Sequence, residues 1–252
     1  VNRMGFNNPG AAAVRDRLID RRASGMWPKV PVAANIGRSR KTPNESAPSD
    51  YSSTLEMLWN QADMFVLNVS SPNTPGLREL QEVDHLSSIL AECKMMSERK
   101  GGGKPLLLKL SPDNSDDEII ASAQMAMRMD IDGFVATNTT LHRPVPKNAA
   151  SRSVFAEGGG LSGRPLQARS NEVIRLLYEE AGSAVPIVGV GGIDSVDTAW
   201  QAVASGASLL QLYSALVFNG PSVVSGIVKG LGRKVKENGF LGIEEAVGLD
   251  IT

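Results

Sequence analysis

The sequence contains one cysteine, Cys93, and two histidines, His85 and His142. A single cysteine excludes an intramolecular disulfide, and two distant histidines lack the spacing of metal ligands, so we expect no metal site. Aromatic residues are only 5% of the 252 residues, and no apolar run is long enough to span a bilayer. Lys+Arg (26) and Asp+Glu (27) give a net charge of −1. Without an excess of positive charge, nucleic-acid binding is not expected.

What is present is a series of short runs rich in Val, Ile and Leu, each followed by a turn and a helical stretch. The runs are nearly continuous, which is typical of strands covered on both faces in a parallel sheet. We expect strands at residues 30–36, 64–69, 105–110, 133–137, 186–190 and 209–213. We expect helices at 11–22, 50–61, 84–100, 116–129, 169–180, 196–205 and 221–237, the fourth of them opened by a capping box of Ser115 and Glu118.

Repeated strand–helix units with this spacing predict an α/β fold, a (β/α)8 TIM barrel. About six of the eight units are visible, and the chain opens on a loop that leads into a helix. We therefore expect residues 1–252 to form one barrel domain from which about two N-terminal units are absent. The strands at 30–36 and 209–213 are then open barrel edges with exposed apolar surface.

Polar residues gather at the C-terminal ends of the six expected strands, the end that carries the chemistry in such barrels. Turn formation by Asn and Ser would explain one or two of them, but the pattern at six strands favours a site. Strand by strand they are Asn35 and Gly37; Asn68, Ser70, Ser71 and Asn73; Lys109; Thr137, Asn138, Thr139 and Thr140; Gly189, Gly191 and Gly192; and Tyr213 and Ser214.

Lys109 lies inside the apolar run 106–110, where a charge is costly unless it is paired. A lysine in a barrel mouth requires an anionic partner, such as a phosphate or an electron-rich ring. The glycines at 189–192, just before a helix, suit a phosphate bound by backbone N–H groups. A Gly-Gly pair also occurs, however, where a strand packs tightly against a helix. Together, Lys109 and these glycines predict a phosphate-bearing cofactor.

Other features have simpler interpretations. Cys93 falls in a helix beside Met95 and Met96, so packing is favoured over a nucleophilic role. The acidic residues Asp113, Asp116, Asp117 and Glu118 are typical of a helix N-terminus rather than of paired catalytic carboxylates.

Five segments, in this order, resemble the dihydroorotate dehydrogenase family over essentially the whole chain. They are residues 2–8 (NRMGFNN), 68–78 (NVSSPNTPGLR), 137–140 (TNTT), 159–163 (GGLSG) and 189–192 (GVGG). The second is the most specific. Class 1 enzymes of the family have a cysteine as the catalytic base, where this sequence has Ser71, so the sequence resembles class 2, the quinone-linked form.

The resemblance implies a barrel that binds FMN and oxidises dihydroorotate to orotate in pyrimidine synthesis. Ser71 corresponds to the general base that removes the C5 proton, with Thr74 and Phe6 lining its proton relay. The implied flavin contacts are Asn35, Asn68, Lys109 and Thr137, with Gly163, Gly192, Tyr213 and Ser214 at the ribityl chain and phosphate. The implied substrate contacts are Asn2, Arg3, Met4, Gly5, Phe6, Asn68, Asn73, Asn138 and Thr139.

The family also carries an early Ala-Gly-x-x-Lys segment and an N-terminal helical pair that binds the membrane and forms the quinone entry, and neither is in this sequence. For the full-length protein the resemblance implies peripheral membrane association, at the cytoplasmic side of a bacterial inner membrane or at the mitochondrial inner membrane. The present chain alone is expected to be soluble.

Two alternatives stay open at this point. A class 1-like enzyme would pass electrons to fumarate or NAD, and Ser71 in place of cysteine counts against it. A phosphate-binding barrel without flavin would be a lyase or isomerase, with Lys109 as a Schiff-base lysine, or an inactive fragment. A flavin-bound protein is yellow, and borohydride trapping would reveal the Schiff base.

Overall fold

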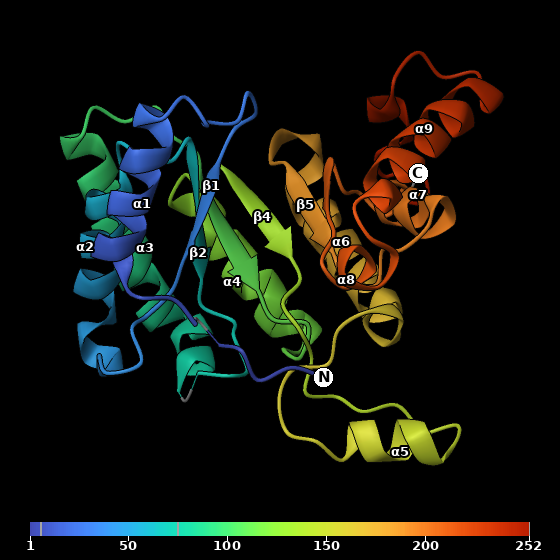
Figure 1. Cartoon of the computed structure of the whole chain (residues 1–252), viewed down its shortest axis with the longest axis horizontal. Coiled ribbons are helices and arrows are strands. Elements are labelled where there is room, and N and C mark those ends of the chain that lie inside the picture. Colours follow the sequence, from blue (N-terminus) through green and yellow to red (C-terminus); the bar gives the residue numbers. More distant parts are fainter. Residues whose placement is uncertain (6, 75, 252) are drawn as a thin grey trace.

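The structure, a computed structural model, describes residues 1–5, 7–74 and 76–251. Its centre is one curled sheet of six parallel strands arranged in sequence order, each hydrogen-bonded to the next (Figure 1). The strands are β1 (Ala33–Ile36), β2 (Met64–Asn68), β3 (Leu106–Leu110), β4 (Gly133–Ala136), β5 (Ile187–Val190) and β6 (Leu209–Gln211). The six expected strands are confirmed, and sequential parallel order is that of a barrel unit rather than of a doubly wound sheet.

The two faces of the sheet carry different side chains. Residues in parallel register share a face, and so do alternate residues along one strand. Val66 of β2 pairs with Leu107 of β3, and two residues further Asn68 pairs with Lys109. Val66, Leu107, Val135 and Val188 form a small cluster on the inner face of the sheet. The register therefore places Asn68 and Lys109 on that inner face, above an apolar floor.

The outer face packs against the helices. Phe65, Leu67, Leu108 and Phe134 are fully buried there, in a core cluster shared with Tyr51 and other helix residues. Cys93 is buried in the same cluster, as a packing residue would be. The helices are α1 (Ala11–Ala23), α2 (Ala47–Leu58), α3 (Val83–Arg99), α4 (Asp116–Arg128), α5 (Ala149–Phe155), α6 (Gln167–Ala181), α7 (Val196–Ala204), α8 (Ser214–Asn219) and α9 (Ser222–Glu237).

Seven of these helices are close to their expected positions, and the capping box of Ser115 and Glu118 is present at the start of α4. Helix α2 begins three residues early, at Ala47, because a proline is tolerated in the first turn. Helices α5 and α8 were not expected, since 7 and 6 residues are too few for a periodic pattern. Within the described residues, no helix combines the length and apolarity that a membrane crossing requires.

The sixth strand is shorter than expected. It ends at Gln211, and Tyr213 and Ser214 belong to the start of α8 rather than to the strand end. Strands β1 and β6 are the two edges of the sheet, as expected for an incomplete barrel. Apolar side chains are exposed at both edges: Val30 (65%) before β1, Leu209 (57%) in β6 and Phe218 (84%) in α8.

Candidate functional site: the mouth of the curled sheet

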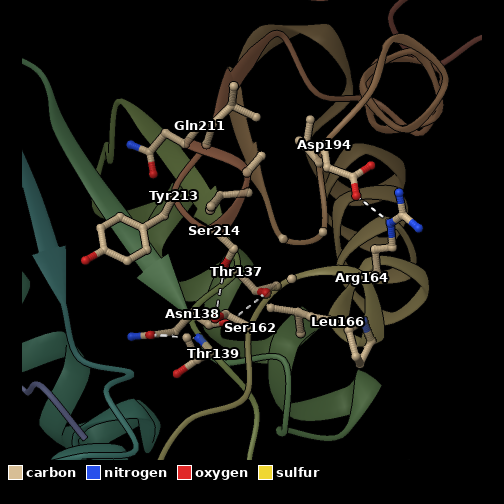
Figure 2. A pocket seen from close by; sticks show the side chains of 18 of the residues that line it. Thr137, Asn138, Thr139, Ser162, Arg164, Leu166, Asp194, Gln211, Tyr213 and Ser214 are labelled. Carbon is tan, nitrogen blue, oxygen red and sulfur yellow. Dashed lines mark hydrogen bonds and ion pairs between the residues drawn. The ribbon is translucent and has the colours of Figure 1, made fainter. Parts of the chain in front are cut away.

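A cavity of about 780 Å³ lies at the C-terminal ends of strands β3 to β6 (Figure 2). Because parallel strands all end at the same edge, residues distant in sequence meet there. Of the expected site residues, the cavity is lined by Asn2, Lys109, Thr137, Asn138, Thr139, Gly163, Gly192, Tyr213 and Ser214. Gln211, Arg164 and Asp194 also line it, although no sequence pattern indicated them.

Lys109 is the one cation in the middle of the inner face among the described strands. Within the described part of the chain, no hydrogen bond or ion pair holds its ammonium group. Burial lowers the pKa of Lys109 from 10.5 to about 8, because the charged form is poorly solvated there. An unpaired cation at the floor of a cavity favours an anionic ligand, since the ligand's charge would replace the missing solvation.

Asn68 and Asn138 form the polar centre of the site. The side-chain oxygen of Asn68 accepts hydrogen bonds from the Ser70 backbone (3.2 Å), from the Ser70 hydroxyl (3.0 Å) and from Asn138 Nδ2 (3.1 Å). The oxygen of Asn138 accepts from the Thr139 backbone (2.8 Å). Because three donors hold the Asn68 oxygen, its Nδ2 points away from them and has no partner among the described residues.

A second asparagine pair comes from the N-terminal segment. Asn73 Nδ2 donates to Asn2 Oδ1 over 3.2 Å, and the Asn2 backbone pairs with Gly160 in an antiparallel bridge. Thr139 is adjacent, and its buried hydroxyl oxygen has no hydrogen-bond partner within the described residues. The four expected asparagines thus occur as two contacting pairs, and one member of each pair, Asn2 or Asn138, lines the cavity.

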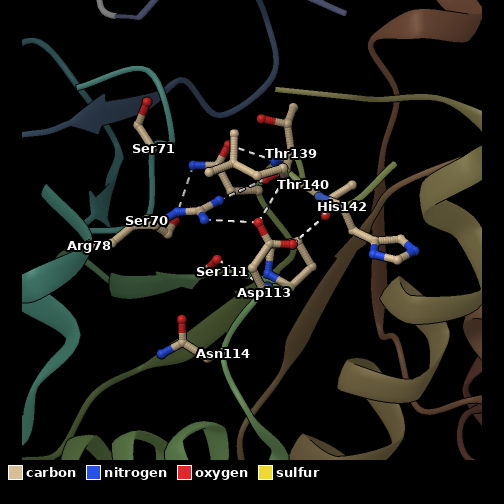
Figure 3. A network of polar contacts seen from close by, with 12 residues as sticks. Ser70, Ser71, Arg78, Ser111, Asp113, Asn114, Thr139, Thr140 and His142 are labelled. Atoms are coloured by element: carbon tan, nitrogen blue, oxygen red, sulfur yellow. Dashed lines mark hydrogen bonds and ion pairs between the residues drawn. The ribbon is translucent and has the colours of Figure 1, made fainter. Parts of the chain in front are cut away.

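Ser71 lies in the loop directly after β2. It is buried (7% exposed), and its hydroxyl oxygen accepts a hydrogen bond from the Asn73 backbone N–H over 3.3 Å. Figure 3 shows the Ser71 hydroxyl directed away from the neighbouring polar network. The hydroxyl is therefore positioned by the loop backbone while its own proton is not used in that contact.

The far end of the cavity is built from glycines and hydroxyls. Gly192 has φ +71, and a Cβ there would come within 2.5 Å of Gln167 Cβ, so only glycine fits. The hydroxyls of Ser162 and Ser214 are 3.1 Å apart across the cavity wall (Figure 2). Hydroxyls and closely approachable backbone suit a phosphate group.

An ionic network lies beside the asparagines, and the sequence did not predict it (Figure 3). Asp113 was expected to serve the N-terminus of α4. Instead its carboxylate pairs with Arg78 (2.8 Å) and accepts hydrogen bonds from the Thr140 hydroxyl and the Leu141 backbone N–H (2.7 Å). Arg78 also donates to the Thr139 carbonyl (3.4 Å). The network ties the Ser71 loop to the end of β4, and no local sequence pattern reveals it, because its members are up to 63 residues apart.

Some expected site residues lie elsewhere. Arg3, Met4, Gly5, Asn35 and Asn73 line a second cavity of about 740 Å³ along the outer edge of β1. Arg3 forms an exposed ion pair with Glu157 (3.0 Å), whereas Met4 Sδ accepts a hydrogen bond from the Tyr213 hydroxyl at the rim of the first cavity (3.7 Å). Phe6 lies outside the described residues.

The family model for dihydroorotate dehydrogenase matches residues 1–235. The chain belongs to the dihydroorotate dehydrogenase family. It is 43% identical over 254 residues to a protein of Trichodesmium erythraeum named dihydroorotate dehydrogenase (quinone), and 42% identical over 255 residues to the protein of that name in Nostoc punctiforme. These alignments cover 99% and 100% of this chain, but 66% and 67% of the relatives. The chain thus spans about two thirds of their length.

Solved structures of the family have the same fold. A crystal structure of the Eimeria tenella enzyme in complex with ferulenol superposes with a TM-score of 0.89 at 31% identity, covering 99% of this chain and 71% of that one. The ligand-free form gives 0.90 at 33% identity, covering 99% and 74%. The expected barrel fold and family are therefore confirmed. Dihydroorotate dehydrogenase membership also implies a flavin cofactor. The lone Lys109 ammonium and the glycine-lined far end fit such a group.

Proposed function

We propose that the full-length protein oxidises dihydroorotate to orotate with bound FMN and passes the electrons to a quinone, in pyrimidine synthesis. The observation that carries the proposal is that Lys109, Asn2 and Asn138 line one cavity at the C-terminal end of a sheet of this family. Asn73 and Asn68 are hydrogen-bonded to those two asparagines, and the Asn73 backbone holds Ser71. Residues 1–252 supply the FMN-binding catalytic barrel domain in this proposal.

The asparagines would hold the substrate. Dihydroorotate has ring amides, which donate and accept hydrogen bonds, and a carboxylate, which accepts them. Asn68, with its oxygen occupied, offers Nδ2 as a donor, and the Thr139 hydroxyl has no partner among the residues that the structure describes. The proposed substrate set is Asn2, Arg3, Met4, Gly5, Phe6, Asn68, Asn73, Asn138 and Thr139.

Ser71 would take the proton from C5 of the substrate. A serine hydroxyl is a weak base near neutral pH, so it must pass its own proton to solvent as the substrate proton arrives. The hydrogen bond from the Asn73 N–H to Ser71 Oγ stabilises charge that develops on that oxygen. The flavin, when bound, accepts the hydride that leaves C6.

FMN would lie along the first cavity. Lys109 would neutralise negative charge on the ring system, with Asn35, Asn68 and Thr137 as further ring contacts. Asn35 shares the face of Val66, with which it pairs, so its side chain belongs to the inner face although it lines the second cavity. Gly163, Gly192, Tyr213 and Ser214 would hold the ribityl chain and phosphate.

Two features favour a quinone over fumarate or NAD as the electron acceptor. The base position carries Ser71 rather than cysteine, and the relatives described above are named as quinone enzymes. A quinone acceptor is dissolved in the bilayer, so we extend the proposal to peripheral membrane association of the full-length protein.

The proposal is tested on purified full-length protein by its absorbance and by stopped-flow mixing with dihydroorotate. We expect a yellow protein whose flavin bleaches with dihydroorotate and recovers its colour with a soluble quinone. Recovery with fumarate or NAD alone would reject the quinone. A colourless protein trapped by borohydride with a carbonyl substrate would reject the flavin chemistry and support the Schiff-base alternative.

A further inference from the structure

The guanidinium of Arg143 is surrounded by backbone carbonyls. Its nitrogens donate to the carbonyl oxygens of Thr140 (3.2 Å), Leu141 (3.2 Å), His142 (3.4 Å), Phe155 (3.3 Å), Glu157 (3.1 Å) and Gly159 (2.6 Å). One carbonyl belongs to Thr140 and the others to the two ends of residues 141–159, which we call the arm. Helix α5 lies in the arm and stands away from the rest of the molecule (Figure 1). Arg143 therefore closes the base of the arm.

The two chain segments that Arg143 joins both lead into the site. Thr140 follows Asn138 and Thr139 at the end of β4, and it pairs with Leu161 in an antiparallel bridge. Gly160 precedes Leu161 and pairs with Asn2 in a second bridge. The N-terminal segment, the end of the arm and the end of β4 thus lie side by side, and each contributes a proposed substrate contact or its immediate neighbour.

The packing at this point allows almost no displacement. A Cβ on Gly159 would lie 2.2 Å from the Asn2 carbonyl oxygen, and a Cβ on Gly160 would lie 2.0 Å from Thr139 Oγ1. Both distances are far below contact distance, so the glycine backbone is pressed against Asn2 and Thr139. The Asn2 side chain also donates from Nδ2 to the Gly160 carbonyl over 3.3 Å. A shift of the glycines would therefore move the side chains of Asn2 and Thr139, which line the cavity.

We propose that Arg143 is a positioning residue for substrate binding, acting through Gly159 and Gly160 on Asn2 and Thr139. This inference rests on the proposed function, because it assigns those two side chains to the substrate. Arg143 does not touch the mouth itself: it is absent from the cavity lining, and its hydrogen bonds run to the arm base.

The hydrogen bonds from Arg143 to the carbonyls at the base of the arm, which we call the clamp, require an arginine. A planar guanidinium presents five N–H donors in a fixed fork, so it can serve carbonyls on two chain segments at once. A lysine keeps the charge but has three donors on one nitrogen, so it can replace at most three of the six hydrogen bonds. Leu141, His142 and Glu157 are exposed, so water can replace the hydrogen bonds that their carbonyls lose. We therefore expect the loss of Arg143 to loosen the site rather than unfold the protein.

The clamp also predicts which kinetic constant changes. Ser71 lies in the loop after β2, and none of the Arg143 hydrogen bonds reaches that loop. Asn2 contacts the loop through the side chain of Asn73, whereas Ser71 is held by the Asn73 backbone N–H. Disturbing the clamp should therefore weaken substrate binding and leave proton removal intact. If Arg143 has a structural role without positioning, its loss should change neither the KM nor the rate of flavin reduction. Activity would then fall only in proportion to the folded protein lost.

The experiment compares full-length Arg143→Lys and Arg143→Gln with Arg152→Lys and Arg152→Gln. Arg152 is the matched control, an exposed arginine of α5 in the same arm whose side chain has no hydrogen bond to any of the described residues. We expect both Arg143 variants to raise the KM for dihydroorotate and the Kd for orotate about tenfold, the order expected for one ligand hydrogen bond lost. The rate of flavin reduction at saturating substrate and its pH profile should stay within about threefold of the parent.

The outcomes separate this inference from the proposed function. A parent protein that does not reduce its flavin with dihydroorotate rejects the proposed function. A working parent whose KM and orotate Kd are unchanged in both Arg143 variants rejects the clamp, and so does an equal change in the Arg152 controls. If Arg143→Lys fails to fold, Arg143 is a folding element and the positioning role is overturned.

Discussion

Asn68 and Asn138 come from the ends of β2 and β4, with β3 between them, and Asn138 Nδ2 donates to Asn68 Oδ1 over 3.1 Å. This contact, with the two from Ser70, fixes the orientation of the Asn68 amide: its oxygen is held by three donors, and its nitrogen has no partner among the described residues. An unpaired donor distinguishes ligands that present an acceptor to it from ligands that do not.

The Asn68→Asp substitution tests this orientation. It keeps the shape and the acceptor oxygen but replaces the unpaired donor by an oxygen and adds a negative charge. We expect orotate affinity, measured from the perturbed flavin absorbance, to fall at least tenfold, equivalent to about 1.4 kcal/mol. Because the new charge lies at a nearly buried position, urea denaturation checks that the variant is folded before the affinities are compared. An unchanged orotate Kd would show that Asn68 does not donate to the ligand.

Substitution of Ser71 tests the proposed base. In the full-length protein, Ser71→Ala should keep flavin and orotate binding and slow flavin reduction by dihydroorotate about 10²–10⁴-fold, the usual effect of a general base. Ser71→Cys should retain part of the rate with a profile shifted to lower pH, since a thiol ionises near a pKa of about 8.5. Stopped-flow absorbance across pH measures both. If Ser71→Ala reduces its flavin at the parent rate, the loop has only a structural role.

Lys109 should lower the stability of the flavin-free protein. Its folded-state pKa of about 8 lies below the ordinary value of 10.5, so the unfolded state binds the proton more tightly. The cost is fully present below pH 8 and disappears as pH rises toward 10.5. Urea unfolding of flavin-free Lys109→Met should show a gain of about 1–3 kcal/mol at pH 7 that shrinks above pH 8.

When FMN is bound, Lys109 should stabilise the protein instead of destabilising it, because an anionic ligand compensates the buried charge. Lys109→Met should then lose flavin more readily than the parent, measured by the flavin fluorescence released on dilution. Equal flavin retention in parent and variant would show that Lys109 does not face the cofactor.

The ionic network under the site predicts an unequal effect of two aspartates. The Asp113 side chain is 19% exposed; it pairs with Arg78 and accepts hydrogen bonds from Thr140 and Leu141. The Asp116 side chain is 58% exposed and pairs with Arg169. Asp113→Asn should lower the free energy of unfolding by about 2–4 kcal/mol, because the charge of half-buried Arg78 loses its partner. The control Asp116→Asn should cost less than about 1 kcal/mol. Urea denaturation of the two variants measures both losses of unfolding free energy. Equal losses would contradict the structural role of the network.

The sequence by itself determined the strands and the side of the sheet on which the site lies. Each strand is a run of apolar residues long enough to be read locally, and a parallel sheet then sends all the C-terminal ends to one edge. Lys109 could be singled out for the same reason, since one charge in an apolar run is visible without a structure. The strings around Ser71 and Asn138 were specific enough to indicate the family.

Only the tertiary structure decided which residues meet. Asn2 and Asn73 are 71 residues apart, and their hydrogen bond depends on the arm returning Gly160 to the N-terminal segment. Asp113 was assigned to a helix terminus because acidic residues before a helix usually serve it, yet Arg78 binds it from another loop. Arg143 gave no signal at all, because its partners are backbone carbonyls, which every residue has. Local propensity therefore fixed the strands and their polar ends, while the contacts that orient the site follow from long-range packing, which no local pattern records.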